Sequence, residues 1–129
     1  MKNYLFNVII PSISIDNHLK NCLSKLEKQK YKKFFVTIIL DKKQKINYKY
    51  KFKLNSLSAN KSNMSKKRNL AAKKFKSDYI AFLDSDAYPN EDWLKIANSH
   101  FNLKPDEIIG GPNIPFPNEK EKEIISHYC

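Results

Sequence analysis

The sequence predicts an α/β domain in which a mostly parallel β-sheet is flanked by helices. Three short runs, at residues 4–10, 34–40 and 79–83, contain almost only apolar and aromatic side chains. Strands of this kind are typical of parallel sheets whose two faces are both covered by helices. Segments with helical spacing of apolar residues lie between the runs, so that strands and helices alternate along the chain.

The first half of the chain predicts a strand, a helix and a second strand. The run at 4–10 ends at Pro11, and either Ser14 or Asp16 is placed to cap a helix that continues to about Lys30. The run at 34–40 is the second strand and ends in Asp41. Apolar side chains recur along the helix at helical spacing, at Leu19, Cys22, Leu23 and Leu26.

The second half predicts two more helices and further strands. Residues 42–63 predict a loop and a short, more exposed strand, because apolar side chains alternate with polar ones through Tyr48, Tyr50, Phe52 and Leu54. Residues 62–76 predict a helix capped by Ser62, and the third apolar strand follows at 79–83. Pro89 predicts the first turn of another helix, and residues 107–109 predict a last short strand. We expect a single domain over residues 1–129.

Basic residues are concentrated in the middle of the chain. Residues 20–76 hold 19 of the 24 basic side chains and only two acidic ones, Glu27 and Asp41. Such a segment favours a polyanionic partner, which could be a nucleic acid, an anionic membrane or a phosphorylated ligand. However, 23 of the 24 are lysine and only Arg68 is arginine. This composition is equally typical of solvent-exposed positions, and it is poorly suited to the bidentate contacts that read bases.

Polar residues follow each of the three apolar strands. Pro11 and Ser12 follow the first, Asp41 the second, and Asp84-Ser85-Asp86 the third. The carboxyl ends of parallel strands meet at one edge of the sheet, where open α/β sheets bind ligands. One or two carboxylates suffice for a Mg²⁺ or Mn²⁺ ion when a diphosphate and water complete its coordination. The alternative is that Asp84-Ser85-Asp86 is an ordinary turn before a helix.

Glycine is scarce, and this narrows the way in which a phosphate could be held. Gly110 and Gly111 are the only glycines, so the glycine-rich phosphate-binding motifs are absent. A bound phosphate would then be neutralised by a metal ion and basic side chains, and Arg68 is a candidate.

Two long stretches resemble a known family. "NVIIPSISIDNHLKNCLSKLEKQ" is similar to the opening of the family 2 glycosyltransferases, which have the Rossmann-like GT-A fold. "KKRNLAAKKFKSDYIAFLDSDAYPNEDWL" is similar to the A-R-N-x-G motif, strand, D-x-D and P-x-W-L of the same family. The resemblance implies a nucleotide-diphosphate-sugar donor, with a UDP-sugar the best choice, and a Mn²⁺ or Mg²⁺ cofactor.

The resemblance also implies roles for the matching residues. Asp41 would bind the base, Arg68 would contact the base or the diphosphate, and Asp84 and Asp86 would hold the metal ion. The nucleotide pocket as a whole would be formed by Pro11, Ser12, Asp41, Arg68 and Asp84. The sequence departs from the family where Lys42 and Lys43 follow Asp41, since the family often has a second acidic residue there.

The family continues past the position of Cys129 with an acceptor-binding half, which commonly carries the general base. General-base catalysis needs a positioned group within hydrogen-bond reach of the acceptor hydroxyl. We therefore assign no catalytic base, and we expect a donor-binding part of a GT-A domain with little transfer activity of its own.

Two other classes of function remain open at this point. Asp84 and Asp86 could be the nucleophile and the acid/base of a phosphatase of the haloacid dehalogenase type, although that motif normally lies on a first strand. A non-enzymatic basic module could bind single-stranded nucleic acid or a membrane through the lysines and aromatic residues between Lys45 and Lys53.

The start of the chain predicts a strand, because its apolar run is short and no small-residue cleavage site follows it. No apolar run is long enough to span a membrane. The two cysteines, Cys22 and Cys129, lack the spacing of a metal site. We expect a cytoplasmic protein that could lie at the inner face of a membrane and use a lipid-linked acceptor, with no specific nucleic acid partner.

Overall fold

The computed structural model of the chain describes residues 1–60 and 63–108. These residues form four strands, β1 (Phe6–Pro11), β2 (Phe34–Leu40), β3 (Lys53–Ser58) and β4 (Tyr79–Phe82). They also form three helices, α1 (Asn17–Leu26), α2 (Met64–Lys74) and α3 (Trp93–Leu103). All four strands are parallel, in the order β3-β2-β1-β4. The α/β class and the parallel sheet predicted from the sequence are confirmed.

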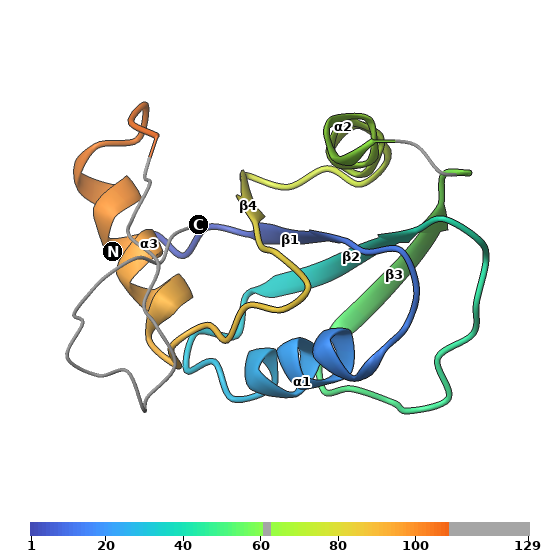
Figure 1. Ribbon diagram of the computed structural model, residues 1–129. Helices are drawn as coiled ribbons and strands as arrows, with labels where there is room; N and C mark the ends of the chain where they lie inside the picture. The colour runs from blue at the N-terminus through green and yellow to red at the C-terminus, as the bar shows by residue number, and fades with distance from the viewer. Residues whose placement is uncertain (61–62, 109–129) are drawn as a thin grey trace, which may run out of the picture.

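Helices cover both faces of the sheet, with α2 on one face and α1 on the other (Figure 1). Phe6, Val8 and Ile10 of β1 belong to the larger core, together with buried residues of α1 and α3. Ile9, which points to the opposite face, packs with Ile39 and with Ala71 of α2. Because β1 is buried on both sides, every one of its residues is buried, and this explains why its sequence is apolar except at Asn7.

The helix α1 begins and ends at clear signals. Asp16 is its N-cap, and the Asp16 carboxylate accepts a hydrogen bond of 2.9 Å from the backbone N–H of Leu19. The helix ends at Leu26, earlier than predicted, because the N–H groups of Lys28 and Gln29 turn to carbonyls three residues back. Leu19, Leu23 and Leu26 are fully buried, and each contributes about 1.5–3 kcal/mol through removal of apolar surface from water.

The α2 helix is attached to the sheet by a buried polar network. The side chain of Asn7, which is fully buried, donates a hydrogen bond of 3.2 Å to the carbonyl of Phe75 at the end of α2. The same side chain accepts a hydrogen bond of 2.8 Å from the hydroxyl of Thr37 in β2. Asn63 caps the start of this helix by accepting from Lys66 N–H, whereas the predicted cap, Ser62, lies outside the described residues. The network fixes how α2 sits above β1 and β2.

The prediction that Pro89 opens the third helix is wrong, because α3 begins at Trp93. Asn90 forms a turn before the helix, in which its side-chain oxygen accepts a hydrogen bond of 2.8 Å from Asp92 N–H. The carbonyl of Asn90 is taken by the buried side chain of Gln29, which donates to it at 2.6 Å. The backbone is therefore held in a turn at the point where helix was expected.

Two strand predictions also need correction. The loop and the short, more exposed strand predicted within residues 42–63 are present, and the strand is β3. Of the four alternating residues only Leu54 lies on it, whereas Tyr48, Tyr50 and Phe52 lie in the loop before β3, where their rings pack on one another and on the core. Glu107 and Ile108 are not in a strand, and residue 109 of that predicted strand lies outside the described residues. No helix formed by residues 1–60 and 63–108 is long and apolar enough to cross a membrane.

We predict that Gln29→Leu lowers the free energy of unfolding by about 2 kcal/mol, measured by urea denaturation. Gln29 donates to the carbonyl of Asn90 and accepts a hydrogen bond of 3.1 Å from Leu94 N–H. Leucine would leave the buried Leu94 N–H without this partner, and it would leave the Asn90 carbonyl with the hydrogen bond from Trp93 N–H alone. The exposed neighbour gives the matched control, and Lys28→Ala should stay within about 0.5 kcal/mol of the parent. Equal stability of the two variants would contradict this role.

Candidate functional site

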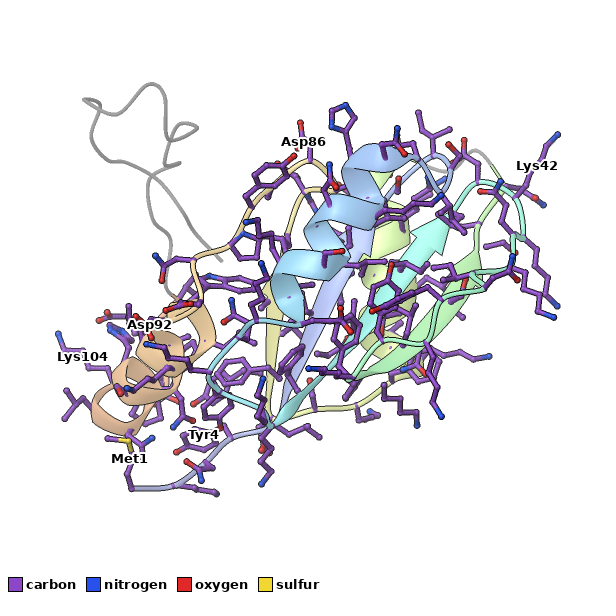
Figure 2. The ribbon with its side chains drawn as sticks, turned by 90° about the horizontal axis from the view of Figure 1, so that it is seen from below. Met1, Tyr4, Lys42, Asp86, Asp92 and Lys104 are labelled. Atoms are coloured by element: carbon purple, nitrogen blue, oxygen red, sulfur yellow. The ribbon has the colours of Figure 1, made fainter. Side chains whose placement is uncertain are left out.

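The residues predicted to bind a ligand lie at the carboxyl edge of the sheet. Ser12 follows β1 directly, Asp41 follows β2, and Asp84 follows β4 after one intervening residue. Figure 2 shows Asp86 and Lys42 at one end of the molecule and Tyr4, which precedes β1, at the other end. The parallel topology thus brings together residues that are up to 74 positions apart in the sequence, from Ser12 to Asp86.

A buried lysine joins two of these positions. Lys67 of α2 is only 2% exposed, and its ammonium group donates a hydrogen bond of 3.0 Å to the carbonyl of Ser12. The same group forms an ion pair with the carboxylate of Asp41. A buried charge is costly unless it is both paired and hydrogen-bonded, and Lys67 has both kinds of partner. Asp41 is therefore fixed in place, with part of its side chain still open to solvent.

Sequence reasoning missed Lys67. It lies in a run of basic residues, Lys66-Lys67-Arg68, that looks like a solvated helix face. The spacing of Lys67 could have indicated its burial. It precedes the buried Ala71 by four residues and therefore lies on the face of α2 that packs on the sheet.

The Asp84-Ser85-Asp86 segment forms a turn, which was the predicted alternative to a metal site. Ala87 N–H donates a hydrogen bond of 3.0 Å to the carbonyl of Asp84, which closes a four-residue turn with Asp86 on it. Both carboxylates are exposed. The turn form does not exclude a ligand-binding role, since it presents two carboxylates one residue apart at the edge of the sheet.

Arg68 lies next to this turn. Its guanidinium group is 3.5 Å from the carboxylate of Asp84 and lies over the ring of Phe82, 5.4 Å from the ring centroid. Since Asp84 is 75% exposed, this ion pair contributes little to stability, within about 1 kcal/mol. The Nε atom of Arg68 is buried and has no hydrogen-bond partner among the described residues. The side chain as a whole is 34% exposed, so the guanidinium group remains accessible to an anionic group.

Cys22 lies beneath the turn, and the negative charges of the turn affect the pKa of its thiol. The thiol donates to the carbonyl of Asp84 at a sulfur–oxygen distance of 3.8 Å. Burial raises the pKa of the Cys22 thiol to about 12, with further contributions from the negative charges of Asp86 and Asp84. The thiol is consequently neutral at physiological pH, and both carboxylates are close enough to Cys22 to act on it.

The donor atoms at the turn fit a hard cation such as Mg²⁺ or Mn²⁺, which prefers carboxylate oxygen. Asp84 and Asp86 offer up to four such oxygens. Within the described part of the chain, no group of three or more His, Cys, Asp or Glu side chains is arranged to hold a metal ion. The two aspartates would therefore need oxygen atoms from a ligand to complete a coordination shell.

The predicted site residues thus fall into two connected groups. Ser12 and Asp41 are joined through Lys67, and Arg68 is joined to Asp84. Pro11 is buried as the last residue of β1, next to Ser12 and opposite Ile39 of β2. Lys67 and Arg68 are consecutive residues of α2, so one helix connects the two groups.

Polar groups at the carboxyl edge of an open parallel sheet define an α/β domain of the class that binds ligands at this edge. The profile of the Glycosyl transferase family 2 matches residues 7–127 of the chain, which is nearly its whole length. The chain belongs to this family. The family assignment favours a transferase over the phosphatase alternative, and it agrees with the position of the aspartates after the fourth strand and not the first.

The curated relatives are poly(ribitol-phosphate) beta-N-acetylglucosaminyltransferases named TarS, from two strains of Staphylococcus aureus, Mu50 and MW2. Each is 33% identical over 114 residues, which represent 81% of this chain and 20% of the relative. The chain therefore spans about a fifth of the length of these relatives.

Solved structures confirm the fold. The structure of S. aureus TarS residues 1–349 matches with a TM-score of 0.68 at 27% identity, over 77% of this chain and 32% of that one. A complex of the same TarS fragment with UDP-GlcNAc matches with a TM-score of 0.65 at 26% identity, over 77% and 31% of the two chains. The Pyrobaculum calidifontis mannosyltransferase PcManGT, in complex with GDP-Man and Mn²⁺, is only 15% identical. Its TM-score of 0.65, over 92% of this chain and 37% of its own, supports the fold alone.

We predict that Lys67→Met destabilises the protein by about 3 kcal/mol in chemical denaturation, because Asp41 would lose the partner of its charge. Adding Asp41→Asn to this variant should recover part of the loss, since the unpaired charge is then removed. Lys66→Met is the matched control, because Lys66 is the exposed neighbour on the same helix. A double variant as unstable as the sum of the two single variants would show that Lys67 and Asp41 do not interact.

We also predict that Cys22 resists alkylation in the folded protein. With a pKa of about 12, only about one thiol in ten thousand is ionised at pH 8, and the thiolate is the reactive form. A Cys129→Ser variant leaves Cys22 as the single cysteine, and iodoacetamide labelling can be followed by mass spectrometry. Labelling should be at least about 100-fold slower in buffer than in urea. Comparable rates in the two solvents would refute the buried, protonated state.

Proposed function

We propose that this chain is the donor-binding part of a family 2 glycosyltransferase. The donor is a nucleotide-diphosphate sugar, and a UDP-sugar is our choice. The observation that carries the proposal is the arrangement at the carboxyl edge, where Asp41, Arg68, Asp84 and Asp86 surround the end of the sheet. The relation to TarS supports it, since the structure of TarS with UDP-GlcNAc has the same fold at 26% identity.

In this proposal Ser12 and Asp41 bind the nucleoside, with Pro11 in the adjoining wall. Lys67 neutralises part of the charge of Asp41 and holds one carboxylate oxygen. The remaining acceptor capacity of Asp41 suits a donor such as the imide N–H of uracil. Lys67 thereby acts as a positioning residue for the two groups, because it touches both and is itself shielded from solvent.

The diphosphate lies between Arg68 and the turn. Arg68 brings a permanent positive charge on a guanidinium group that is partly exposed at this edge. Asp84 and Asp86 would hold a Mn²⁺ or Mg²⁺ ion together with diphosphate oxygens. When bound there, the ion would act as a Lewis acid that stabilises the departing nucleoside diphosphate. Without a ligand, Arg68 and Asp84 pair with each other, so that each charge has an opposite charge beside it.

The acceptor is part of the proposal as well. The relatives are named for transfer to poly(ribitol-phosphate), a polymer with phosphate groups and hydroxyls. An acceptor that carries negative charge fits the excess of lysine in this chain, which has a formal net charge of +11. A lipid-linked acceptor at an anionic membrane surface, expected from the sequence, has the same electrostatic character.

We predict that the chain binds UDP only weakly without metal and more tightly with MnCl₂, measured by isothermal titration calorimetry. Asp86→Asn should weaken binding in the presence of Mn²⁺ by about tenfold or more, since even residues that merely orient metal ligands change affinity by about 10- to 100-fold. Asp106→Asn is the matched control, because Asp106 is equally exposed but follows α3, away from the turn.

Two results would refute the site assignment. One is equal affinity for UDP with and without the metal ion. The other is an Asp86→Asn variant that binds UDP as tightly as the parent in MnCl₂. Thermal denaturation of both variants checks that the folded state is intact in each.

A further inference from the structure

A hollow lies beside α1, and Ser12, Asp41 and Lys67 are not among the residues that line it. It has a volume of about 600 Å³. Lys20 and Ser24 of α1 form one wall, and the loop that follows β2 forms the other. We call this hollow the α1 groove. The loop wall is made of Gln44, Lys45, Asn47, Tyr48 and Tyr50, with Ile15 and Ile46 completing the lining.

The loop wall is held in place by the protein core. Tyr50 stacks on Phe52 at 5.2 Å between ring centroids, and Phe52 packs at 5.6 Å on Phe34, which is buried in the sheet. At the other end of the loop, the side-chain oxygen of Gln44 accepts a hydrogen bond of 2.9 Å from Ile15 N–H. The groove is therefore a formed feature and not a gap beside a free loop.

The lining of the groove carries positive charge on Lys20 and Lys45 and includes no acidic side chain. Residues 42–53 include six lysines, all exposed, and no acidic residue. Lys20 adds a positive charge from the opposite wall. Two acidic side chains lie near the loop. Asp41 is already paired with Lys67, and the carboxylate of Glu27 accepts a hydrogen bond of 3.0 Å from Lys51 N–H, so it offsets part of the positive charge. The excess of positive charge selects an anionic ligand.

The polar groups of the groove suit a ligand that is rich in hydroxyls. Ser24, Asn47 and the free amide nitrogen of Gln44 supply donors and acceptors along the walls. Burial raises the pKa of the Tyr50 phenol, and the negative charge of Glu27 raises it further, so this hydroxyl keeps its proton. Tyr48 is 61% exposed and offers a ring face on which the CH groups of a sugar or polyol can pack.

Single-stranded nucleic acid fits the groove less well. Successive bases need successive open ring faces. Here Phe52 covers one face of Tyr50, and Tyr48 meets Tyr50 edge-on at 4.6 Å. A membrane surface fits less well too, because insertion needs protruding apolar side chains, whereas Ile15 and Ile46 are partly buried in a concave wall.

We propose that the α1 groove binds a phosphodiester-linked polyol chain, with Lys20 and Lys45 contacting its phosphates and Tyr48 packing on its carbon backbone. The loop that carries this wall begins directly after β2, at the carboxyl edge of the sheet, and Lys42 and Asp86 both lie on the upper side of Figure 2. A chain in the groove would thus extend toward the edge where the donor is proposed to bind. The role of the polyol chain as an acceptor rests on the proposed function, whereas its binding in the groove does not.

The test is binding of a fluorescent ribitol-phosphate oligomer to the full 129-residue chain, followed by anisotropy at low salt. Lys20→Gln/Lys45→Gln should weaken binding about fivefold, since two exposed charge contacts contribute up to about 1 kcal/mol together. Tyr48→Ala should also weaken binding, and its effect should persist at high salt because it is not electrostatic. Lys73→Gln/Lys74→Gln is the matched control, because it removes equal charge from exposed positions on α2, across the sheet.

Three outcomes would overturn the proposal. The first is an equal loss of affinity in the control variant, which would indicate non-specific attraction. The second is equally tight binding of an oligo-dT with the same number of phosphates. The third is a requirement for the groove lysines in binding vesicles of phosphatidylglycerol but not in binding the oligomer.

UDP titration of the same variants separates the two proposals. The groove variants should bind UDP as the parent does. If the parent binds the oligomer but not UDP, the donor site fails and the groove stands. If it binds UDP but not the oligomer, only the groove proposal fails.

Discussion

The ammonium group of Lys67 is the contact on which the arrangement of the carboxyl edge depends. It is buried, and it bonds both to the carbonyl that follows β1 and to the carboxylate that follows β2. Because a buried charge is tolerated only with such partners, α2 has little freedom to rotate or slide over the sheet. The next residue, Arg68, is thereby directed toward Asp84 and Phe82 beyond the other side of β1. One helical turn thus sets the relation between three strand ends.

The turn with Asp84 and Asp86 is supported from below by α1. The thiol of Cys22 contacts the carbonyl of Asp84, and the amide of Gln29 binds the segment that leads from the turn into α3. These contacts explain why two exposed carboxylates occupy a defined place at the sheet edge. Cys22 of α1 and Gln29, which follows this helix, belong to the stretch that resembles the family 2 glycosyltransferases. These contacts show that both residues have a structural role.

The distribution of charge separates two regions of the molecule. Acidic groups lie at the turn after β4, next to a single arginine, and this pattern suits a cation together with a diphosphate. The excess of lysine lies on the loop after β2, beside aromatic rings that are anchored in the core. Both regions start at the carboxyl edge of the sheet, since the loop follows the end of β2 and the turn follows the end of β4. In the proposed function the acidic turn serves the donor and the basic loop serves the acceptor.

The sequence by itself determined the α/β class, the run of β2 and the presence of aspartates at strand ends, because apolar runs and turn residues are local signals. It also identified the family. It failed at Lys67, at the start of α3 and at Tyr48 to Phe52, where distant partners decide the outcome. Lys67 is buried because Ser12 and Asp41 meet it, α3 starts late because Gln29 holds Asn90, and the tyrosines form a groove wall because Phe52 packs on Phe34. Such contacts between residues far apart in the chain exist only in the tertiary structure, since local propensity carries no record of them.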